Sequence, residues 1–358
     1  MDLNLREDCA HALLVPTSMG VRLTADRRQP THCSSHFTMH VTSAETNVVS
    51  PVAFLGLPVK ILTALVEGSP IARMISDDLA RRRIAVEAKS VDPGGAWGWR
   101  HQINIADSGY GARGPRVYND RAGEVGRTLT AADFDLERIF GAEGVKIVHL
   151  SGLFAALSPE TAALCEQVAR VAKSHGSVVS FDLNYRASFW RGREQELATS
   201  FAAIAQQADI LVGNEEDFQL ALGLAGPEAG GKDLAGKMES FRGMIGAAQR
   251  AYPKAQLFAT TLREVVNANE HLWGAILYAD DWYVAEPRSI GVLDRIGGGD
   301  GFVGGMLYGL LRGWEPQRCL QFGWATGALA ASSLTDYAQP ADEAEVWSIW
   351  DGDARVKR

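Results

Sequence analysis

Cysteine and histidine are sparse in this chain, and neither is arranged as a metal site or a disulfide framework would require. The four cysteines of the 358 residues are far apart and form no C-x-x-C pair, and the eight histidines show no metal-ligand spacing. These absences argue against a zinc site, a disulfide-stabilised secreted fold and a histidine in catalysis. Reduced thiols are expected, as is a location in the cytoplasm.

Long apolar runs and an excess of positive charge are also missing. No apolar stretch approaches the roughly 20 residues that a bilayer-spanning helix needs. The N-terminal segment carries Asp2, Glu7 and Asp8 before a short apolar run at 12–15, which is unlike a secretory signal. The net charge is −8 and the pI is about 5.6. We therefore expect neither a nucleic acid nor a membrane as partner, and an anionic ligand must be bound by a local pocket.

The sequence does contain an alternation of apolar strands and amphipathic helices. With 46% hydrophobic and 22% charged residues a packed core is expected, and the length fits one large α/β domain with an appended subdomain, or two domains. Periodicity and turn residues predict strands at 11–15, 20–24, 59–66, 145–150, 177–182, 210–212 and 256–260, a hairpin of 272–278 with 282–285, and helices from 45 and at 159–174, 238–251, 301–312 and 316–333. Short strands are expected across the glycine-rich 94–127, and a surface loop at 223–236. This order predicts an α/β fold with a doubly wound, mainly parallel sheet flanked by helices.

Three consecutive glycines, Gly297–Gly299, precede Asp300 and an apolar helix. Glycine is entropically costly within regular structure, so the run indicates a place that requires bare backbone. A glycine turn at a helix N-terminus presents free N–H groups and partial positive charge, which suits a phosphate in a protein of negative net charge. Asp300 would then be placed to accept a proton from a substrate hydroxyl. The alternative is a structural N-cap, which accounts for Asp300 but not for three glycines.

Asp294–Phe302 resembles the D-x-x-G-A-G-D-x-F signature of the ribokinase-like, or pfkB, carbohydrate kinases, and within them the 2-keto-3-deoxygluconate kinases. Supporting segments follow in the family's order along the chain: Arg22-Leu23, Ala44–Asn47, Tyr118, Asp120–Gly123, His149–Gly152, Phe181–Arg186 and Gly213–Asp217. The resemblance implies a single ribokinase-like α/β domain over 1–358, with a small β-lid formed by about 20–43 and 97–121.

The resemblance also implies ligands and residue roles. ATP would be the phosphoryl donor with Mg²⁺ as cofactor, a need for K⁺ stays open, and a homodimer through the β-lids is expected. Asp300 takes the family's position of catalytic base, and Gly297, Gly298 and Gly299 take that of the anion hole. The implied substrate-binding residues are Ser43, Asn47, Tyr118, Arg121, Arg186 and Asp300. The implied nucleotide-binding residues are Asn214, Thr260, Leu262, Arg263, Gly297 and Gly299. Asn214 and Asp217 would act on the metal through water.

Several of these residues also have a plain structural explanation. Arg186 would serve equally as a surface ion-pair partner, although it follows the C-terminal end of a strand, where open α/β sheets place ligands. Asn214 and Asp217 suit a helix N-terminus as well as a phosphate site, and the two roles are compatible. Thr260–Arg263 is similar to a nucleotide-side turn of these kinases but lacks their usual glycine.

The chain departs from the family pattern beside the expected sugar pocket. Thr42-Ser43 stands where the family has Gly-Gly, and Thr17-Ser18 stands where it has Gly-Glu. Side chains at a place of bare backbone would narrow the pocket, redirect the hydroxyl contacts or leave a degraded site.

The predicted activity is transfer of the ATP γ-phosphoryl group to the primary hydroxyl of a sugar acid, foremost 2-keto-3-deoxygluconate, to give the 6-phosphate. One alternative is a kinase for a neutral sugar such as fructose or ribose, or for a nucleoside. The other is a catalytically weak descendant that only binds a sugar.

Overall fold

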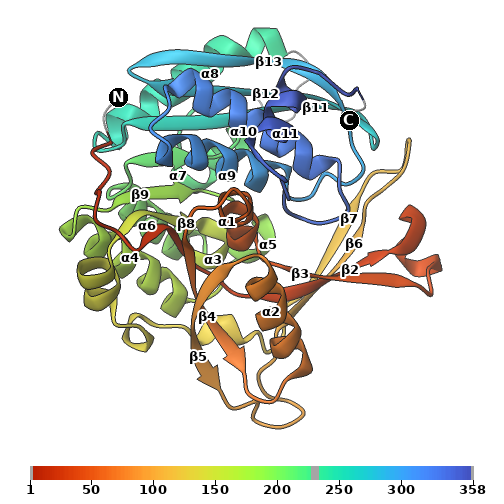
Figure 1. Cartoon of the computed structure of the whole chain (residues 1–358), viewed down its shortest axis with the longest axis vertical. Helices are drawn as coiled ribbons and strands as arrows, with labels where there is room; N and C mark the ends of the chain where they lie inside the picture. Colours follow the sequence, from red (N-terminus) through yellow and green to blue (C-terminus); the bar gives the residue numbers. More distant parts are fainter. Residues whose placement is uncertain (1–2, 227–233, 356–358) are drawn as a thin grey trace.

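In the computed structural model, which describes residues 3–226 and 234–355, one large sheet runs through the centre of the molecule (Figure 1). Its nine strands lie in the order β13-β12-β11-β10-β9-β8-β1-β4-β5. Every neighbouring pair from β11 to β5 is parallel, and β12 and β13 add an antiparallel edge. The strands are β1 (His11–Pro16), β4 (Val59–Val66), β5 (Ile84–Val91), β8 (Val145–Ser151), β9 (Val178–Asp182), β10 (Ile210–Val212), β11 (Leu257–Asn267), β12 (Glu270–Ala279) and β13 (Asp281–Gly291).

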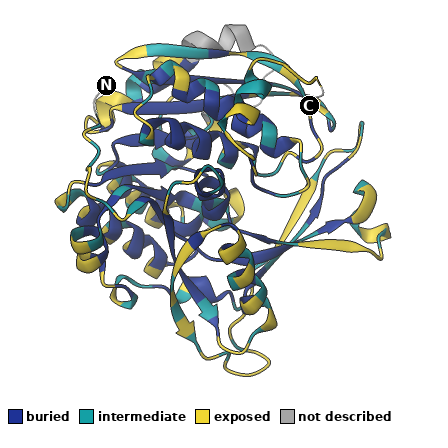
Figure 2. Ribbon diagram, viewed as in Figure 1, coloured by how far each residue is buried: buried dark blue, intermediate teal, exposed yellow. Residues whose placement is uncertain are grey.

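Successive residues of the central strands face two separate cores, because side chains alternate across a sheet. Leu14 and Val148 point to one core, and Leu13, Val15 and Ile147 to the other. The first core is covered by α4 (Pro159–Ser174), α6 (Glu194–Ala205), α7 (Glu215–Leu222) and α8 (Leu234–Ala251), and the second by α1 (Ala44–Phe54), α2 (Pro70–Arg81), α9 (Gly298–Leu311), α10 (Pro316–Ala331) and α11 (Glu343–Trp350). Burial on both faces explains why these strands are near-continuous apolar runs (Figure 2).

A second, four-stranded sheet projects from one side of the molecule in the order β3-β2-β6-β7 (Figure 1). Its strands are β2 (Gly20–Ala25), β3 (Phe37–Thr42), β6 (Gln102–Asp107) and β7 (Arg116–Asp120). Because β1 ends at Pro16 and β2 begins at Gly20, the small sheet starts beside the carboxyl end of a central strand. That edge is where open α/β sheets bind their ligands.

The predicted fold class is confirmed, since a mainly parallel sheet is flanked by helices and accompanied by a separate small sheet. The strands 59–66 and 210–212 and the helix 159–174 have the predicted bounds. Among the elements that escaped prediction are α2, β5, α6 and α11. Of the loop predicted at 223–236, residues 227–233 lie outside the described residues, and α8 already begins at Leu234. None of the helices in the described ranges is long and apolar enough to cross a membrane.

Candidate active site

The start of α9 combines one glycine that packing requires with two that it does not. Gly297 caps the helix in the left-handed region with φ 83°, and a Cβ there would lie 1.6 Å from the carbonyl oxygen of Asp336. At Gly298 the nearest atom to a Cβ would be 3.7 Å away, and at Gly299 nothing lies within 4 Å. The first N–H groups of a helix have no acceptor within it. The Gly298 N–H donates to the carbonyl of Arg295 over a long 3.4 Å, and Gly299 adds bare backbone with nothing near its Cα face. The start of α9 therefore offers the bare backbone that an anion hole needs, with one of its donors weakly bonded.

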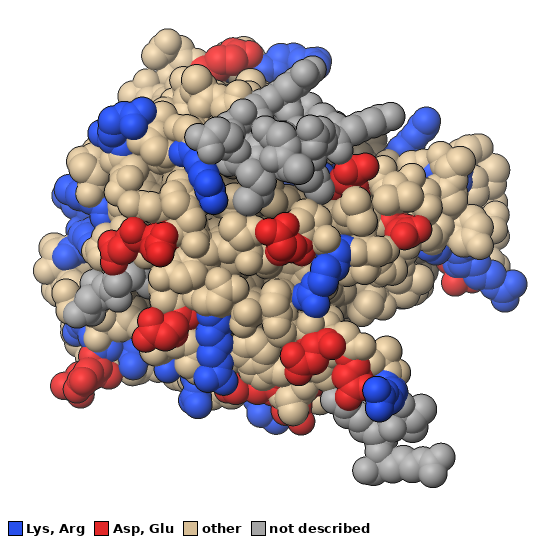
Figure 3. All heavy atoms as spheres, turned by 90° about the horizontal axis from the view of Figure 1, so that it is seen from above, with Lys and Arg blue, Asp and Glu red and all other residues tan. Residues whose placement is uncertain are grey.

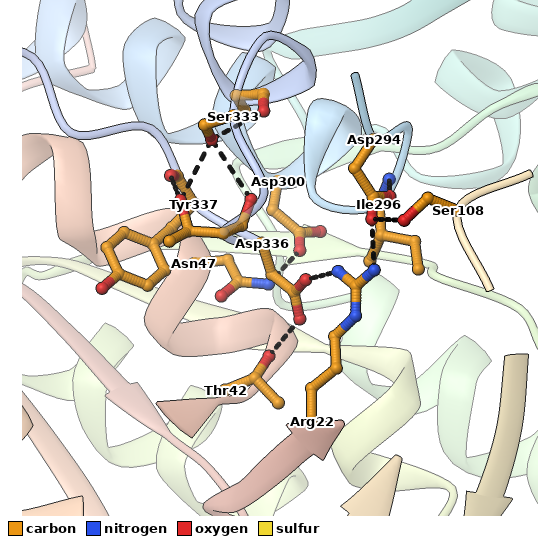
Figure 4. Close-up of polar contacts among 12 residues, drawn as sticks. Arg22, Thr42, Asn47, Ser108, Asp294, Ile296, Asp300, Ser333, Asp336 and Tyr337 are labelled. Carbon is orange, nitrogen blue, oxygen red and sulfur yellow. Dashed lines mark hydrogen bonds and ion pairs between the residues drawn. The ribbon is translucent and has the colours of Figure 1, made fainter. Parts of the chain in front are cut away.

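Asp300 lies in the first turn of α9, and its carboxylate is held from the neighbouring helix α1. Asn47 donates from Nδ2 to Oδ2 of Asp300 over 2.8 Å (Figure 4). Burial raises the pKa of Asp300 to about 7, against the lowering effects of the Asn47 hydrogen bond and of Arg186; Glu45 and Asp336 raise it further. A carboxylate of this pKa is poised to accept a proton near neutral pH.

A hollow opens beside the two bare glycines, on the side of β11, β12 and β13. Its lining includes Gly298 and Gly299, the guanidinium-bearing Arg263 and Arg295, and Trp273. Two cationic side chains and a helix N-terminus facing one space suit the phosphates of a nucleotide. We refer to this hollow and the adjoining start of α9 as the phosphate side of the candidate site, after the role predicted from the sequence.

The predicted turn at Thr260–Arg263 is wrong, because β11 continues as a strand to Asn267 and pairs with β12 throughout. Alternation along the strand separates the predicted nucleotide residues. Arg263 faces the hollow, whereas Leu262 is buried in a hydrophobic core. The Thr260 hydroxyl is buried and, among the described residues, has no hydrogen-bond partner. The structure thus brings Arg263 to the site and leaves Leu262 out of it.

A second small cavity lies between α1 and the small sheet, and we refer to it as the sugar side, after the role predicted from the sequence. Its polar lining consists of Ser18, Ser43, Glu45, Gln102 and Arg121, and its apolar lining of Ala44, Leu153, Phe154 and Leu157. Within the described chain, Oε1 of Glu45, Oε1 of Gln102 and Nε of Arg121 are buried without a hydrogen-bond partner. Acceptors and a donor around one cavity fit a ligand that carries several hydroxyl groups.

The two departures from the family pattern contact each other at this cavity. The Thr17 hydroxyl lies 2.6 Å from Oε2 of Glu45 and 2.8 Å from Oγ of Ser43. Ser18 donates to Oε1 of Glu124 over 2.5 Å, and Nη1 of Arg121 donates to the same oxygen over 2.7 Å. The replaced positions therefore form a connected wall of hydroxyl and carboxyl groups.

Arg186 lies on the phosphate side, just beyond β9. Its guanidinium lowers the pKa of Asp300, and after burial it is the next cause of the lowered pKa of Arg295. Burial raises the pKa of the nearby Asp182 well above its usual range, and Asp217 and Asp300 raise it further. In the described part of the chain Arg186 forms no ion pair within 4 Å, so its surface ion-pair explanation finds no partner.

Asn214 and Asp217 form the N-terminal capping box of α7. The Asn214 side chain accepts from the backbone N–H of Asp217 over 3.0 Å, and Asp217 accepts from the N–H of Asn214 over 2.8 Å. Asp217 also accepts from the N–H of Tyr185 over 2.8 Å, and burial raises its pKa to about 6. The structural role is thus present, and it places an acidic group beside the turn that carries Arg186.

Tyr118 is on the opposite face of the small sheet from the cavity. It lies in one cross-strand row with Ile105, Leu23 and Met39, whereas Gln102 faces the cavity. Its side chain is 66% exposed. The structure therefore does not bring Tyr118 to the other predicted substrate residues, because strand alternation turns it away.

Sequence reasoning missed several residues that line the two hollows. Glu45 and Arg295 were visible in family segments but had no role attached to them, and Gln102, His271 and Trp273 carried no local signal. Only the order of the strands in space shows that these side chains converge.

The model of the pfkB family carbohydrate kinases matches residues 126–249 and 273–342, more than half of the chain. A 5-dehydro-2-deoxygluconokinase of Clostridium perfringens is 27% identical over 207 residues, which cover 57% of this chain and 54% of that protein. One from Clostridium beijerinckii is 28% identical over 215 residues, 60% and 56% of the two chains. The chain thus matches about half the length of these curated relatives.

Solved structures resemble the chain over nearly its whole length. The 2-dehydro-3-deoxygluconokinase of Thermotoga maritima superposes with a TM-score of 0.85 at 24% identity, covering 97% of this chain and 100% of that one. A PfkB family carbohydrate kinase from Listeria grayi gives a TM-score of 0.81 at 25% identity, with coverages of 96% and 100%. These likenesses establish the fold.

Proposed function

The chain belongs to the pfkB family of carbohydrate kinases, and on this premise we propose that it transfers the γ-phosphoryl group of ATP to the primary hydroxyl of a sugar acid. One observation carries the proposal: the Asp300 carboxylate, with a pKa of about 7, stands beside the bare backbone of Gly298 and Gly299. A base and an anion hole at one helix start are what phosphoryl transfer to a hydroxyl requires.

In the proposed reaction Asp300 accepts the proton of the attacking hydroxyl while Asn47 holds the carboxylate in place. General-base help of this kind contributes ~10²–10⁴ in rate. The N–H of Gly299 would bind the transferring phosphoryl oxygens, joined by that of Gly298 in exchange for its 3.4 Å bond to the Arg295 carbonyl. A free donor of this kind is worth about 3 kcal/mol by analogy with measured oxyanion donors. When bound with ATP, Mg²⁺ neutralises charge on the phosphate oxygens.

Asn214 and Asp217 are the residues that we propose to organise Mg²⁺ through water. Across the described ranges, no group of three or more His, Cys, Asp or Glu side chains is placed to hold a metal ion directly. The phosphates and water would therefore supply most of the oxygen ligands, as Mg²⁺ commonly accepts. A need for K⁺ is a further proposal, which an assay in sodium and potassium salts decides.

The sugar-acid class rests on the cavity and on the relatives' names, which denote kinases of dehydro-deoxygluconates. Arg121 lines the cavity, and a guanidinium is the usual partner of a carboxylate. We propose 2-keto-3-deoxygluconate as the acceptor and its 6-phosphate as the product.

A neutral sugar is the second candidate, because the charge of Arg121 is already matched. Glu124 accepts from Arg121 over 2.7 Å, and Glu45 lines the same cavity. Burial raises the pKa of Glu45, and a carboxyl group of this kind beside a guanidinium that already binds Glu124 suits hydroxyl groups better than a further anion. By contrast, the intact pairing of Asp300 with Asn47 speaks against a degraded, merely sugar-binding descendant.

A coupled ADP-release screen tests the proposal. The purified protein is given ATP, Mg²⁺ and K⁺ with 2-keto-3-deoxygluconate, 5-dehydro-2-deoxygluconate, gluconate, fructose, ribose and adenosine in parallel. We expect the highest kcat/KM for a keto-deoxy sugar acid. A preference for fructose or ribose would replace the acceptor class, and tight acceptor binding without ADP release from any compound would overturn the kinase proposal.

We also propose a homodimer through the outer face of the small sheet, and a cytoplasmic location where ATP is at hand. Phe37, Met39 and Tyr118 are 39%, 41% and 66% exposed on that face. Exposed apolar side chains gathered on one face are typical of a contact that is buried in an assembly. Light scattering should give the mass of two chains, and Met39→Lys should shift it toward one.

A further inference from the structure

A buried charge cluster connects the small sheet to the loop that precedes the anion hole. At its centre Arg22 of β2 donates from Nη2 to Asp294 and from Nη1 to Asp336 (Figure 4). The side chains of all three residues are at most 5% exposed. Buried charges of this kind persist only when they are paired.

Two more strands of the small sheet contribute a hydroxyl group each to the same carboxylates. Thr42, the last residue of β3, donates to Oδ2 of Asp336 over 2.6 Å. Ser108, directly after β6, donates to Oδ2 of Asp294 over 2.5 Å. The small sheet therefore holds both aspartates through three of its four strands.

On the other side, the same two aspartates shape the turn that leads into α9. Oδ1 of Asp294 accepts the backbone N–H of Ile296 over 3.0 Å. The carbonyl of Asp336 occupies the place where a Cβ of Gly297 would stand. A movement of either aspartate must therefore move the residues that cap the anion hole, because no space is left between them.

The cluster also acts on Asp300 through its charge. Two carboxylates face one guanidinium, so one negative charge is left over, and Asp336 is among the causes that raise the pKa of Asp300. The other groups that face Asp300 are Asn47 and Glu45 from α1 and the residues Asp182 and Arg186 around the end of β9.

We propose that Arg22 is a positioning residue for phosphoryl transfer, which couples acceptor binding under the small sheet to the geometry of the anion hole. This inference rests on the proposed kinase function. The sugar-side cavity includes Gln102, a residue of β6, so an acceptor that fits there also fixes the small sheet. Arg22 binds Asp294 and Asp336, and Asp336 packs against Gly297, so a fixed small sheet also fixes the start of α9. Acceptor and ATP should then strengthen each other's binding by the same factor, as linkage requires.

The first test compares the wild type with Arg22→Lys, which keeps the charge but cannot bridge two carboxylates as a planar guanidinium does. With ATP·Mg²⁺ and 2-keto-3-deoxygluconate, or the best acceptor of the screen, kcat should fall by about 10- to 100-fold, as for a small misplacement of reacting groups. The affinity for ADP·Mg²⁺ should rise on acceptor addition in the wild type and no longer in the variant. Equal kcat and equal mutual enhancement in both proteins would overturn the proposal.

The second test keeps the inference falsifiable if Arg22→Lys does not fold, as thermal melting would reveal. Asp336→Asn removes a negative charge near Asp300, and Thr42→Val removes a hydrogen bond to the same carboxylate without changing the charge. Since Asp300 works as the ionised base, activity is lost as the pH falls through its pKa. In Asp336→Asn that pKa falls, so the acid limb of kcat/KM should move to lower pH. In Thr42→Val the rate should fall, but the acid limb of kcat/KM should stay at the pH of the wild type.

A purely structural cluster would lower the rate at every pH and leave the acid limb unmoved in both variants, which would overturn the inference while the wild type stays active. A wild type without turnover on every acceptor would instead remove the kinase proposal itself. The two failures are therefore distinguishable.

Discussion

The phosphate side and the sugar side of Asp300 differ in the groups that they present to a ligand. On the phosphate side the chain keeps bare backbone, with Gly298 and Gly299 free of any packing demand. On the sugar side it has Thr17 and Ser43 in a wall of hydroxyl groups around Glu45. The difference shows which part of a kinase is generic: every acceptor needs the same base and anion hole, whereas each acceptor needs its own wall.

The largest effect is expected from removing the Asp300 carboxylate, which lies between the two sides and serves both. Asp300→Asn should lower kcat by about 10²–10⁴ while ATP binding is retained, because an amide cannot accept the hydroxyl proton but fills the same space. Steady-state kinetics and calorimetric titration of ADP·Mg²⁺ measure the two quantities. Turnover within threefold of wild type would take Asp300 out of the mechanism.

Two glycines of the phosphate side should respond in opposite ways to alanine. Gly297→Ala forces a side chain into positive φ and against the Asp336 carbonyl, so stability should fall by about 1–3 kcal/mol or more. Gly299→Ala meets open space and should keep or slightly raise stability, yet raise the KM for ATP because a methyl group crowds the phosphate site. Thermal melting and kinetics of the pair decide it. Equal destabilisation would mean that both glycines serve packing alone.

The same contrast explains how far the sequence could predict the molecule. The helix 159–174 was predicted with its true bounds, because Ser158, Pro159 and an apolar period mark it locally. The continuation of β11 beyond Thr260 was missed, since polar and exposed residues interrupt the alternation there. Local sequence patterns were therefore enough to predict most helices and strands and the glycine motif before α9.

Contacts between distant segments were beyond prediction. Asp336 lies 314 residues from Arg22 along the chain, and Thr17 lies 28 from Glu45. No periodicity or turn signal links such positions, because their contact depends on the order of strands in the folded sheets. The wall and the charge cluster therefore became visible only in the structure.

Replacing Arg121 on the sugar side and Arg186 on the phosphate side should affect different kinetic constants. Arg121→Ala should raise the KM of sugar acids by about 10- to 100-fold, the worth of a charge-assisted hydrogen bond of about 1.5–3 kcal/mol, and that of neutral sugars less. Arg186→Ala should act on kcat and on ATP, because it faces Asp300 and Arg295. Arg73→Ala, which removes an exposed ion pair with Asp77 on α2, is the matched control. Equal losses for acidic and neutral acceptors in Arg121→Ala would argue against carboxylate recognition.

The smallest expected effect concerns the hydroxyl wall alone. Thr17→Val keeps the shape of the side chain but removes the donor to Glu45, a buried hydrogen bond. Glu45 should then turn toward another donor and be less well placed for the acceptor. The KM of the acceptor should rise roughly 2- to 10-fold, which corresponds to the loss of one hydrogen bond of about 0.5–1.5 kcal/mol, while the KM for ATP stays unchanged. Ser76→Ala, which removes a half-buried hydroxyl bonded to Ala72 on α2, should change neither constant. If one hydroxyl of the acceptor binds Glu45, the KM of an acceptor without that hydroxyl should be the same in Thr17→Val and in the wild type. An equal rise in the KM of acceptor and of ATP would show that the wall serves stability and not recognition.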